Sequence, residues 1–400
     1  MKNIFPGYNK KSEAEIKDLW DNGLICFDAN VLLNLYRYSN DTRQALLDLI
    51  KKFSNQICLP HQSALEYNRN RYEVIADQEK AYKDFISKIG QIENDLQSTS
   101  KPPFLSEKVH TSLKTVFKEV NSEVEASIKK YCNFLQEDII YNELSLVFKE
   151  KITNELTKEK LIEIYKEGEE RYKKKTPPGF EDEKTKQGNR KYGDLVLWKQ
   201  IIEKAKLDKK PIILITDERK IDWWWKIKDG RNMGPRQELV EEMRREANVE
   251  FHMYSSERFL SYGLEHLKER GNRKALEEIK EIKRVEIEEI ERIKKRENND
   301  FIKRKQLHAR KEREHTEYLS QKIGRTAGKI ERYKDRLKEL EENSFDVNNE
   351  EESVHLSIDI KNLEERLETL LKQKGSNEAN ENSLLRRLLR DFKNDSDENH

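Results

Sequence analysis

The chain has 400 residues, of which 35% are hydrophobic and 39% are charged. So few apolar side chains cannot fill a single core of that size, and we expect a compact domain joined to long, solvated helices. Lys and Arg number 78 against 77 Asp and Glu, which excludes a strongly basic or acidic chain and leaves any basic surface local.

The three cysteines are Cys26, Cys58 and Cys132. Cys26 and Cys58 lie in apolar, strand-like runs and are predicted to be small buried side chains. No pair has the spacing of zinc ligands, and a low, odd count fits a reducing cytosol. The N-terminal residues form no apolar leader, and no run of about 18 apolar residues occurs. We therefore expect a cytoplasmic protein that does not cross a membrane.

The N-terminal part of the chain predicts an α/β fold. LICFD at residues 24–28 and QICLP, which ends at Pro60, are short apolar runs typical of strands. Helical spacing follows each of them, at residues 42–53 and from residue 61 onward. Strands that alternate with helices indicate parallel βαβ units.

A long helical segment then interrupts the α/β pattern. From about residue 70 to 175 the sequence is charged and almost free of glycine, with Pro102-Pro103 as one break. Apolar residues such as Phe85, Ile89 and Ile92 recur at helical spacing. We interpret the segment as an all-helical insertion.

The α/β pattern returns after TPPGF. Helices are predicted at residues 192–205 and 235–247, the second started by Pro235, and strands at residues 211–217 and 249–254. Four parallel strands with helices on both faces predict a three-layer α/β/α domain.

The C-terminal part is dominated by Glu, Lys and Arg. Two short heptad seams flank the polar loop ENSFDVNNEEES: Ile330, Tyr333, Leu337 and Leu340, then Leu356, Ile360, Leu363, Leu367 and Leu370. They predict a helical hairpin, or self-association or pairing with a partner protein. The predicted domains are residues 1–262, with the insertion at about 70–175, a coiled-coil extension at 263–374, and a tail at 375–400 that is disordered apart from SLLRRLLRDF.

Acidic residues mark the carboxyl ends of two predicted strands. Asp28 and Asp217 each end an apolar run, and parallel sheets bind ligands outside those ends. Glu66, one to two turns into the next helix, and Asp194, at the start of another, can reach the same crevice. An acid before a helix is often only an N-cap, but four such acids together favour a site for a hard divalent cation. Such a cation suits phosphodiester hydrolysis.

Two rival functions follow from the same residues. A phosphohydrolase of the haloacid-dehalogenase type also begins at a strand-terminal Asp, but needs an acid two residues later, where Asn30 stands. A catalytically inactive, nucleic-acid-binding or scaffold protein is the second rival, and the presence of all four acids argues against it.

Five motifs resemble the PIN-like nuclease domain, in particular a larger bacterial branch with a helical insertion. They are FDANVLLNLY (27–36), LPHQSALEYNRNR (59–71), PPGFEDEKT (177–185), YGDLVLWKQ (192–200) and ITDERKIDWWW (215–225), in the order of the family. The resemblance covers about residues 20–262. Ala29 stands where the family often has Thr or Ser, which removes one hydroxyl contact.

The resemblance implies a magnesium- or manganese-dependent nuclease that cleaves RNA more often than DNA. By position, the metal-binding and catalytic acids are Asp28, Glu66, Asp194 and Asp217, with Asp182 as a further metal candidate. Asn30, Thr216 and Asp222 are implied to support them. Large PIN-like proteins with helical additions also resemble effectors of toxin or antiphage defence systems.

Basic and aromatic residues near these acids are candidates for substrate binding. Phosphate contacts are predicted for Lys184, Lys186, Arg190, Lys191, Arg219 and Lys220, although a charge run is usually a solvated face. Trp223, Trp224 and Trp225 either pack onto the sheet or stack on a base.

Overall fold

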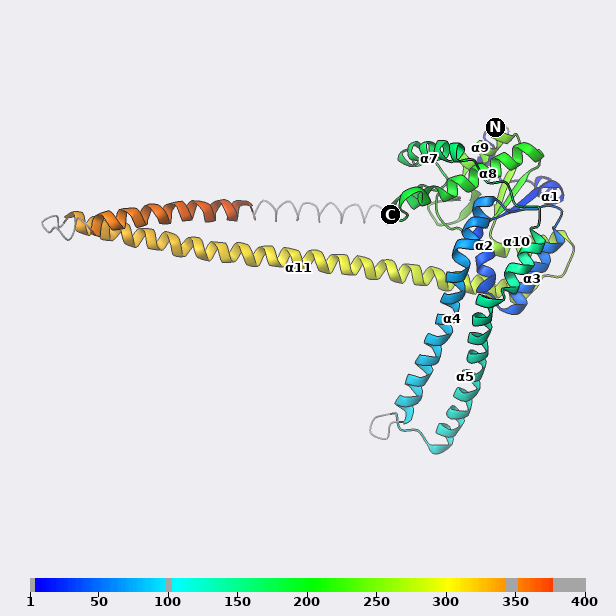
Figure 1. Cartoon of the computed structure of the whole chain (residues 1–400), viewed down its shortest axis with the longest axis horizontal. Helices are drawn as coiled ribbons and strands as arrows, with labels where there is room; N and C mark the ends of the chain where they lie inside the picture. The colour runs from blue at the N-terminus through cyan, green and yellow to red at the C-terminus, as the bar shows by residue number, and fades with distance from the viewer. Residues whose placement is uncertain (1–3, 98–102, 343–351, 377–400) are drawn as a thin grey trace. The chain divides into compact units, whose positions relative to one another are not determined.

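The computed structural model describes residues 4–97, 103–342 and 352–376 (Figure 1). The chain divides into two compact units, Met1–Arg284 and Val285–His400. Within the described ranges, no helix combines the length and the apolar character that a membrane crossing requires.

A four-stranded parallel sheet forms the centre of the first unit. Its strands are β1 (Leu24–Phe27), β2 (Ile57–Cys58), β3 (Ile212–Ile215) and β6 (Phe251–Tyr254), in the order β2-β1-β3-β6. All four lie inside runs that the sequence predicts as strands. Apolar residues make up most of these strands because both faces of the sheet are covered.

Helices cover both faces of the sheet and make three layers. Ile25, Phe27 and Ile215 point into one cluster of buried side chains, whereas Cys26 and Leu214 point into the other. The first cluster is closed by α1 (Glu13–Asn22), α3 (Asn40–Lys52) and α10 (Ser256–His266). The second is closed by α8 (Gly193–Asp208) and α9 (Gln237–Ala247). The predicted α/β/α fold is confirmed, and Cys26 and Cys58 are buried as predicted.

The helical insertion lies between β2 and α8 in the chain. It comprises α4 (His61–Gln97), α5 (Glu107–Gln136), α6 (Ile139–Val147) and α7 (Lys158–Lys173). α4 and α5 run side by side away from the sheet (Figure 1). The Tyr131 hydroxyl donates to the Tyr36 carbonyl at 2.9 Å and anchors α5 to the domain. The predicted break at Pro102-Pro103 lies partly outside the described residues.

Short elements surround the sheet ends. They are η1 (Pro6–Tyr8), α2 (Ala29–Leu33), η2 (Asn34–Tyr36), η3 (Phe180–Lys184), η4 (Gly188–Tyr192) and the antiparallel pair β4 (Trp224–Lys226) and β5 (Asn232–Pro235). The prediction that Pro235 starts a helix is wrong: it ends β5, and α9 begins at Gln237. The sequence gives no alternating pattern that would have revealed this hairpin.

The long helix α11 (Arg273–Glu342) begins inside the first unit. Ala275 and Ile279 are buried in its core. Glu278 accepts hydrogen bonds from the Ser39 hydroxyl and the Thr42 hydroxyl, each at 2.6 Å. The first part of α11, residues 273–284, which we call its root, is therefore packed against α3.

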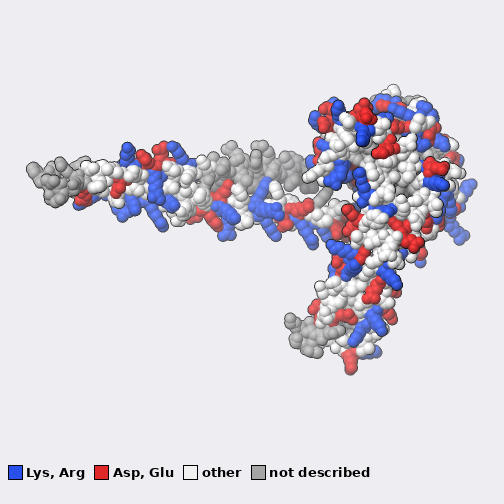
Figure 2. Space-filling view, in the orientation of Figure 1, with Lys and Arg blue, Asp and Glu red and all other residues white. Residues whose placement is uncertain are grey.

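The second unit is a helical hairpin. The rest of α11 pairs with a helix at residues 352–376, and Ile330, Leu340, Ile360 and Leu370 are buried. Lys334 Nζ lies 2.6 Å from Glu364 Oε1 across the pair. Figure 2 shows acidic and basic side chains interspersed over the remaining surface, as expected for solvated helices. Self-association stays a prediction, and the predicted tail lies outside the described residues from 377 onward.

Candidate active site

Asp28 lies directly after β1, at the carboxyl edge of the sheet. Its backbone N–H donates to Ile215 O at 2.9 Å, which sets it beside the end of β3. Asp28 Oδ2 accepts from Asn30 Nδ2 and from the Thr216 hydroxyl, each at 2.7 Å. Asn30 and Thr216 therefore orient this carboxylate, in the supporting position predicted for them.

The carboxylate oxygens of Asp217 are occupied by hydrogen bonds and an ion pair with other side chains and backbone groups. Ser256 donates from its backbone N–H and its hydroxyl, and Asn34 Nδ2 donates at 3.0 Å. Lys283 Nζ lies 2.5 Å from Asp217 Oδ1, and the Asp217 side chain is only 6% exposed. Burial would raise the pKa of Asp217, but the charge of Lys283 and these hydrogen bonds hold the pKa below its usual value. Asp217 thus links β3 to α10 and α11.

Glu218 is a site residue that the sequence reasoning missed. Its Oε1 accepts from the backbone N–H of Arg219 at 2.7 Å, and its charge raises the pKa of both Asp28 and Asp194. Successive side chains of an extended chain point to opposite sides, so the carboxylates of Asp217 and Glu218 contact different neighbours. The sequence signal that could have identified Glu218 is its position directly after Asp217 in the motif ITDE.

Glu66 reaches the site from the second turn of α4. Gln62 Nε2 donates to Glu66 Oε1 at 2.6 Å. A Cβ on Gly193 would lie only 2.8 Å from the same oxygen. Gly193, the residue before Asp194, therefore permits the close approach of α8 to Glu66.

Asp194 lies in the first turn of α8, where its carboxylate meets Trp223 and Lys220. The Trp223 indole N–H donates to Asp194 Oδ2 at 3.1 Å, and Lys220 Nζ lies 3.4 Å from the same atom. Gly179, at φ +93°, packs against this residue, since a Cβ there would lie 3.1 Å from Asp194 Cβ. The PPGF turn is therefore part of the site.

Lys220 occupies the space between three carboxylates. Its ammonium lies 2.7 Å from Asp182 Oδ1 and 3.0 Å from Glu218 Oε2, in addition to Asp194. Lys186 pairs with the other Asp182 oxygen at 2.6 Å. Burial would lower the pKa of Lys220, but the charges of Asp194, Glu218 and Asp182 outweigh it and raise the pKa.

We call Asp28, Glu66, Asp182, Asp194 and Glu218 the acid cluster. Burial, together with the charges of Glu66, Asp194 and Glu218, raises the pKa of Asp28 to about 7. The pKa of Glu66 and that of Asp194 are also raised, first by burial and then by neighbouring acids. Like charges that share a partly buried site favour protonation unless a cation offsets them.

The oxygen donors of the acid cluster are chemically suited to magnesium or manganese. In residues 4–97, 103–342 and 352–376, no three His, Cys, Asp or Glu side chains are arranged as a metal-binding group. The Lys220 ammonium already lies among three of the acids. The donor chemistry and the raised pKa values of Asp28, Glu66 and Asp194 fit a cation, and Lys220 is the positive charge that the chain itself supplies.

The remaining predicted site residues lie around this centre. Asp222 is fully buried and accepts from the backbone N–H groups of Gly179 and Glu181; burial raises its pKa to about 6. It supports the PPGF turn. Trp223 and Trp224 are buried, and Trp225 packs against Tyr8, so all three contribute to packing.

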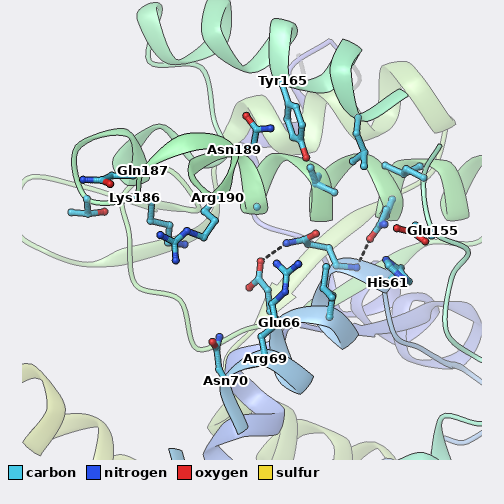
Figure 3. A pocket seen from close by; sticks show the side chains of 18 of the residues that line it. His61, Glu66, Arg69, Asn70, Glu155, Tyr165, Lys186, Gln187, Asn189 and Arg190 are labelled. Atoms are coloured by element: carbon cyan, nitrogen blue, oxygen red, sulfur yellow. Dashed lines mark hydrogen bonds between the residues drawn. The ribbon is translucent and has the colours of Figure 1, made fainter. Parts of the chain in front are cut away.

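The predicted phosphate-binding residues divide into two groups. Lys186 and Lys220 pair with acids, as described above, and Lys191 lies over the Tyr192 ring at 5.0 Å. Lys184 and Arg190 are exposed, and Arg219 is partly exposed. Lys186 and Arg190 line a cavity of about 1010 Å³ beside Glu66 (Figure 3).

A family model described as a PIN-like domain matches residues 24–239, which is more than half of the chain. The match runs from β1 to the first turn of α9 and includes every residue of the acid cluster. No curated protein and no solved structure matches the chain significantly. The chain belongs to the PIN-like domain family.

Proposed function

We propose that this chain is a metal-dependent endonuclease that hydrolyses phosphodiester bonds, with RNA as its substrate. The observation that carries the proposal is that Asp28, directly after β1, lies near Glu66 on α4 and Asp194 on α8. The charge of Asp194 raises the pKa of both Asp28 and Glu66, and the charge of Glu66 raises that of Asp28. PIN-like domains are generally nucleases, and the acids present in this chain suit that reaction.

Asp28, Glu66, Asp194 and Glu218 would hold one or two magnesium or manganese ions, with Asp182 as an adjacent acid. Such an ion lowers the pKa of bound water and offsets charge on a phosphoryl oxygen. Asn30 and Thr216 hold Asp28 in place, and Trp223 holds Asp194. Asp217, with its oxygens occupied by Ser256, Asn34 and Lys283, acts by positioning the loop that carries Glu218.

The proposal is tested with labelled RNA and DNA, manganese, and EDTA as the metal-free arm. Asp28→Asn and Asp194→Asn are expected to remove cleavage and to remain folded, as measured by circular dichroism. Asp229→Asn is the matched control, because Asp229 is half exposed on the β4–β5 hairpin, outside the acid cluster. A folded Asp28→Asn protein with wild-type cleavage overturns the assignment. Preferential cleavage of DNA supports the DNA-directed alternative.

The position of Lys220 favours one second candidate, an inactive nucleic-acid-binding or scaffold protein. An ammonium paired with Asp182, Asp194 and Glu218 offsets part of their negative charge without a metal. Absence of metal-dependent cleavage of RNA and DNA by clean protein supports this candidate.

We further propose that the nuclease acts in the cytoplasm as a toxin or antiphage effector. The proposal rests on the resemblance to large PIN-like proteins with helical additions. Expression of the wild type is expected to slow growth more than expression of Asp28→Asn. Equal growth of the two strains contradicts the toxin proposal.

A further inference from the structure

A cavity of about 1010 Å³ opens beside the acid cluster. Its walls come from α4, from the segment around η4, from α7 and from α8. Glu66 is the member of the acid cluster that lines it, so the cavity lies to one side of the proposed reaction centre. Its volume is at the upper end of the roughly 300–1,000 Å³ of ligand pockets, enough for one nucleotide and too small for a duplex.

The charged side chains of the cavity are separated along its length. Arg69 on α4 and the segment with Lys186 and Arg190 lie on the Glu66 side, whereas His61 and Glu155 lie at the other end (Figure 3). Arg69 and Arg190 are exposed, and neither side chain has a hydrogen bond or ion pair within the described part of the chain. Two guanidinium groups are therefore available to an anion next to Glu66.

The interior of the cavity combines apolar walls with polar groups. Leu161 and Val196 contribute apolar surface, and Glu155 and His61 contribute hydrogen-bonding groups. Tyr165 stacks on Tyr192 with ring centroids 5.4 Å apart, which fixes its orientation, and its hydroxyl end points into the cavity (Figure 3). Flat apolar contacts together with polar edges match the faces and edges of a nucleobase.

We propose that this cavity binds one unpaired nucleotide of a single-stranded RNA, next to the bond that the acid cluster cuts. Arg69 and Arg190 hold the flanking phosphates, and Tyr165 contacts the base. The base must leave any duplex to enter, because a duplex does not fit in a cavity of about 1010 Å³. This inference rests on the proposed nuclease function, and it adds the site that selects the substrate.

Binding is measured separately from cleavage, in EDTA and in the Asp28→Asn background. The probe is a fluorescein-labelled RNA decamer, single-stranded or in a blunt duplex, followed by fluorescence anisotropy at several salt concentrations. Arg69→Ala with Arg190→Ala is expected to weaken single-strand binding at least 10-fold. It is also expected to reduce the log–log salt slope by about 1.4, because each phosphate contact to a single strand contributes about 0.7.

Matched variants separate charge from base contact. Tyr165→Ala is expected to weaken binding about 5-fold or more without changing the salt slope, because both the ring and the hydroxyl are lost. Tyr165→Phe loses only the hydroxyl and is expected to bind with an affinity between those of the parent and Tyr165→Ala. Arg245→Ala is the surface control, since Arg245 is 66% exposed on α9 and is not part of the cavity. Thermal unfolding verifies that each variant is folded.

The outcomes distinguish this inference from the proposed function. Pocket variants that bind with parental affinity and slope overturn the inference, and so does a duplex that binds as tightly as the single strand. If the wild type cleaves RNA with manganese while these variants bind normally, the nuclease function is supported and the proposal that the cavity binds a nucleotide is contradicted. If the variants weaken binding as expected but the wild type cleaves no RNA, the nucleotide-binding proposal is supported and the nuclease function is contradicted.

Discussion

Lys283 Nζ lies 2.5 Å from Asp217 Oδ1, and the two side chains are 15% and 6% exposed. This ion pair joins the acid at the end of β3 to the root of the long helix α11. Ser256 and Asn34 complete the hydrogen bonds of Asp217. A residue of the predicted metal site is thereby tied to an element far along the chain.

Lys283→Met is expected to lower the free energy of unfolding by about 3 kcal/mol, because it leaves a buried carboxylate without its cation. Lys280→Met is the control on the same helix. Lys280 is 63% exposed and lies 3.6 Å from Glu257, so its loss is expected to cost under about 0.5 kcal/mol. Urea unfolding measures both values, and equal losses contradict the structural role of the Lys283–Asp217 pair.

A chain that ends at Arg284 is expected to fold and to retain cleavage, whereas one that ends at residue 262 is expected to lose stability. The shorter chain lacks Ala275 and Ile279, which are buried, and Glu278, which accepts from Ser39 and Thr42. Limited proteolysis and circular dichroism compare the two chains. Equal stability supports the boundary at 262 that the sequence predicts.

Lys220→Met is expected to increase the stabilisation that manganese gives to the protein. The ammonium of Lys220 offsets part of the negative charge of Asp182, Asp194 and Glu218, so its removal leaves more of that charge to the metal. The measurement is the shift in Tm between EDTA and manganese. Lys226→Met, on an exposed part of β4, is expected to show the wild-type shift. A smaller shift in Lys220→Met than in wild type contradicts competition between Lys220 and the metal.

Gly193→Ala is expected to lower the cleavage rate at least 10-fold while changing the free energy of unfolding by less than about 1 kcal/mol. The new Cβ meets Glu66 Oε1, the mobile end of a side chain, which moves at little cost to folding. Gly90→Ala on α4 has open space around it and is expected to be about 0.5–1 kcal/mol more stable, with normal cleavage. If Gly193→Ala cleaves at the wild-type rate, cleavage does not depend on the exact position of the Glu66 carboxylate.

The stability of the fold is expected to fall between pH 4.5 and about 2 through Glu242. Its carboxylate accepts from Arg171 at 2.8 Å and from the Trp198 indole at 2.9 Å, and it joins α7, α8 and α9. Burial alone would raise the pKa of Glu242, but hydrogen bonding and charge from Arg171 lower it to about 2 from a usual value of 4.5. The lowered pKa means that this stabilisation is complete above pH 4.5 and is lost as the group is protonated.

Glu242→Gln tests that dependence. The variant is expected to be about 3 kcal/mol less stable than wild type at pH 7, with the difference shrinking as the pH approaches 2. Urea unfolding at pH 7, 5 and 3 measures it, with Glu241→Gln as the neighbouring control. A difference that does not change with pH would falsify the role of Glu242 ionisation.

The sheet and most of the acid cluster were predictable from local patterns. Short continuous apolar runs bounded by turn residues, such as residues 212–215, are typical of buried parallel strands, and an acid that follows such a strand lies at the carboxyl edge. The positions of Asp28, Glu66 and Asp194 follow from this rule together with the family motifs. The β4–β5 hairpin was not predictable, because its residues do not alternate.

The sequence by itself determined that acids gather at the carboxyl edge of a parallel sheet in a PIN-like domain. Only the tertiary structure decided that Glu218 faces the acid cluster while Asp217 pairs with Lys283 and Ser256. The physical reason is that neighbouring residues beyond a strand end point to different sides. Their partners, here from α10 and α11, are chosen by the packing of distant helices.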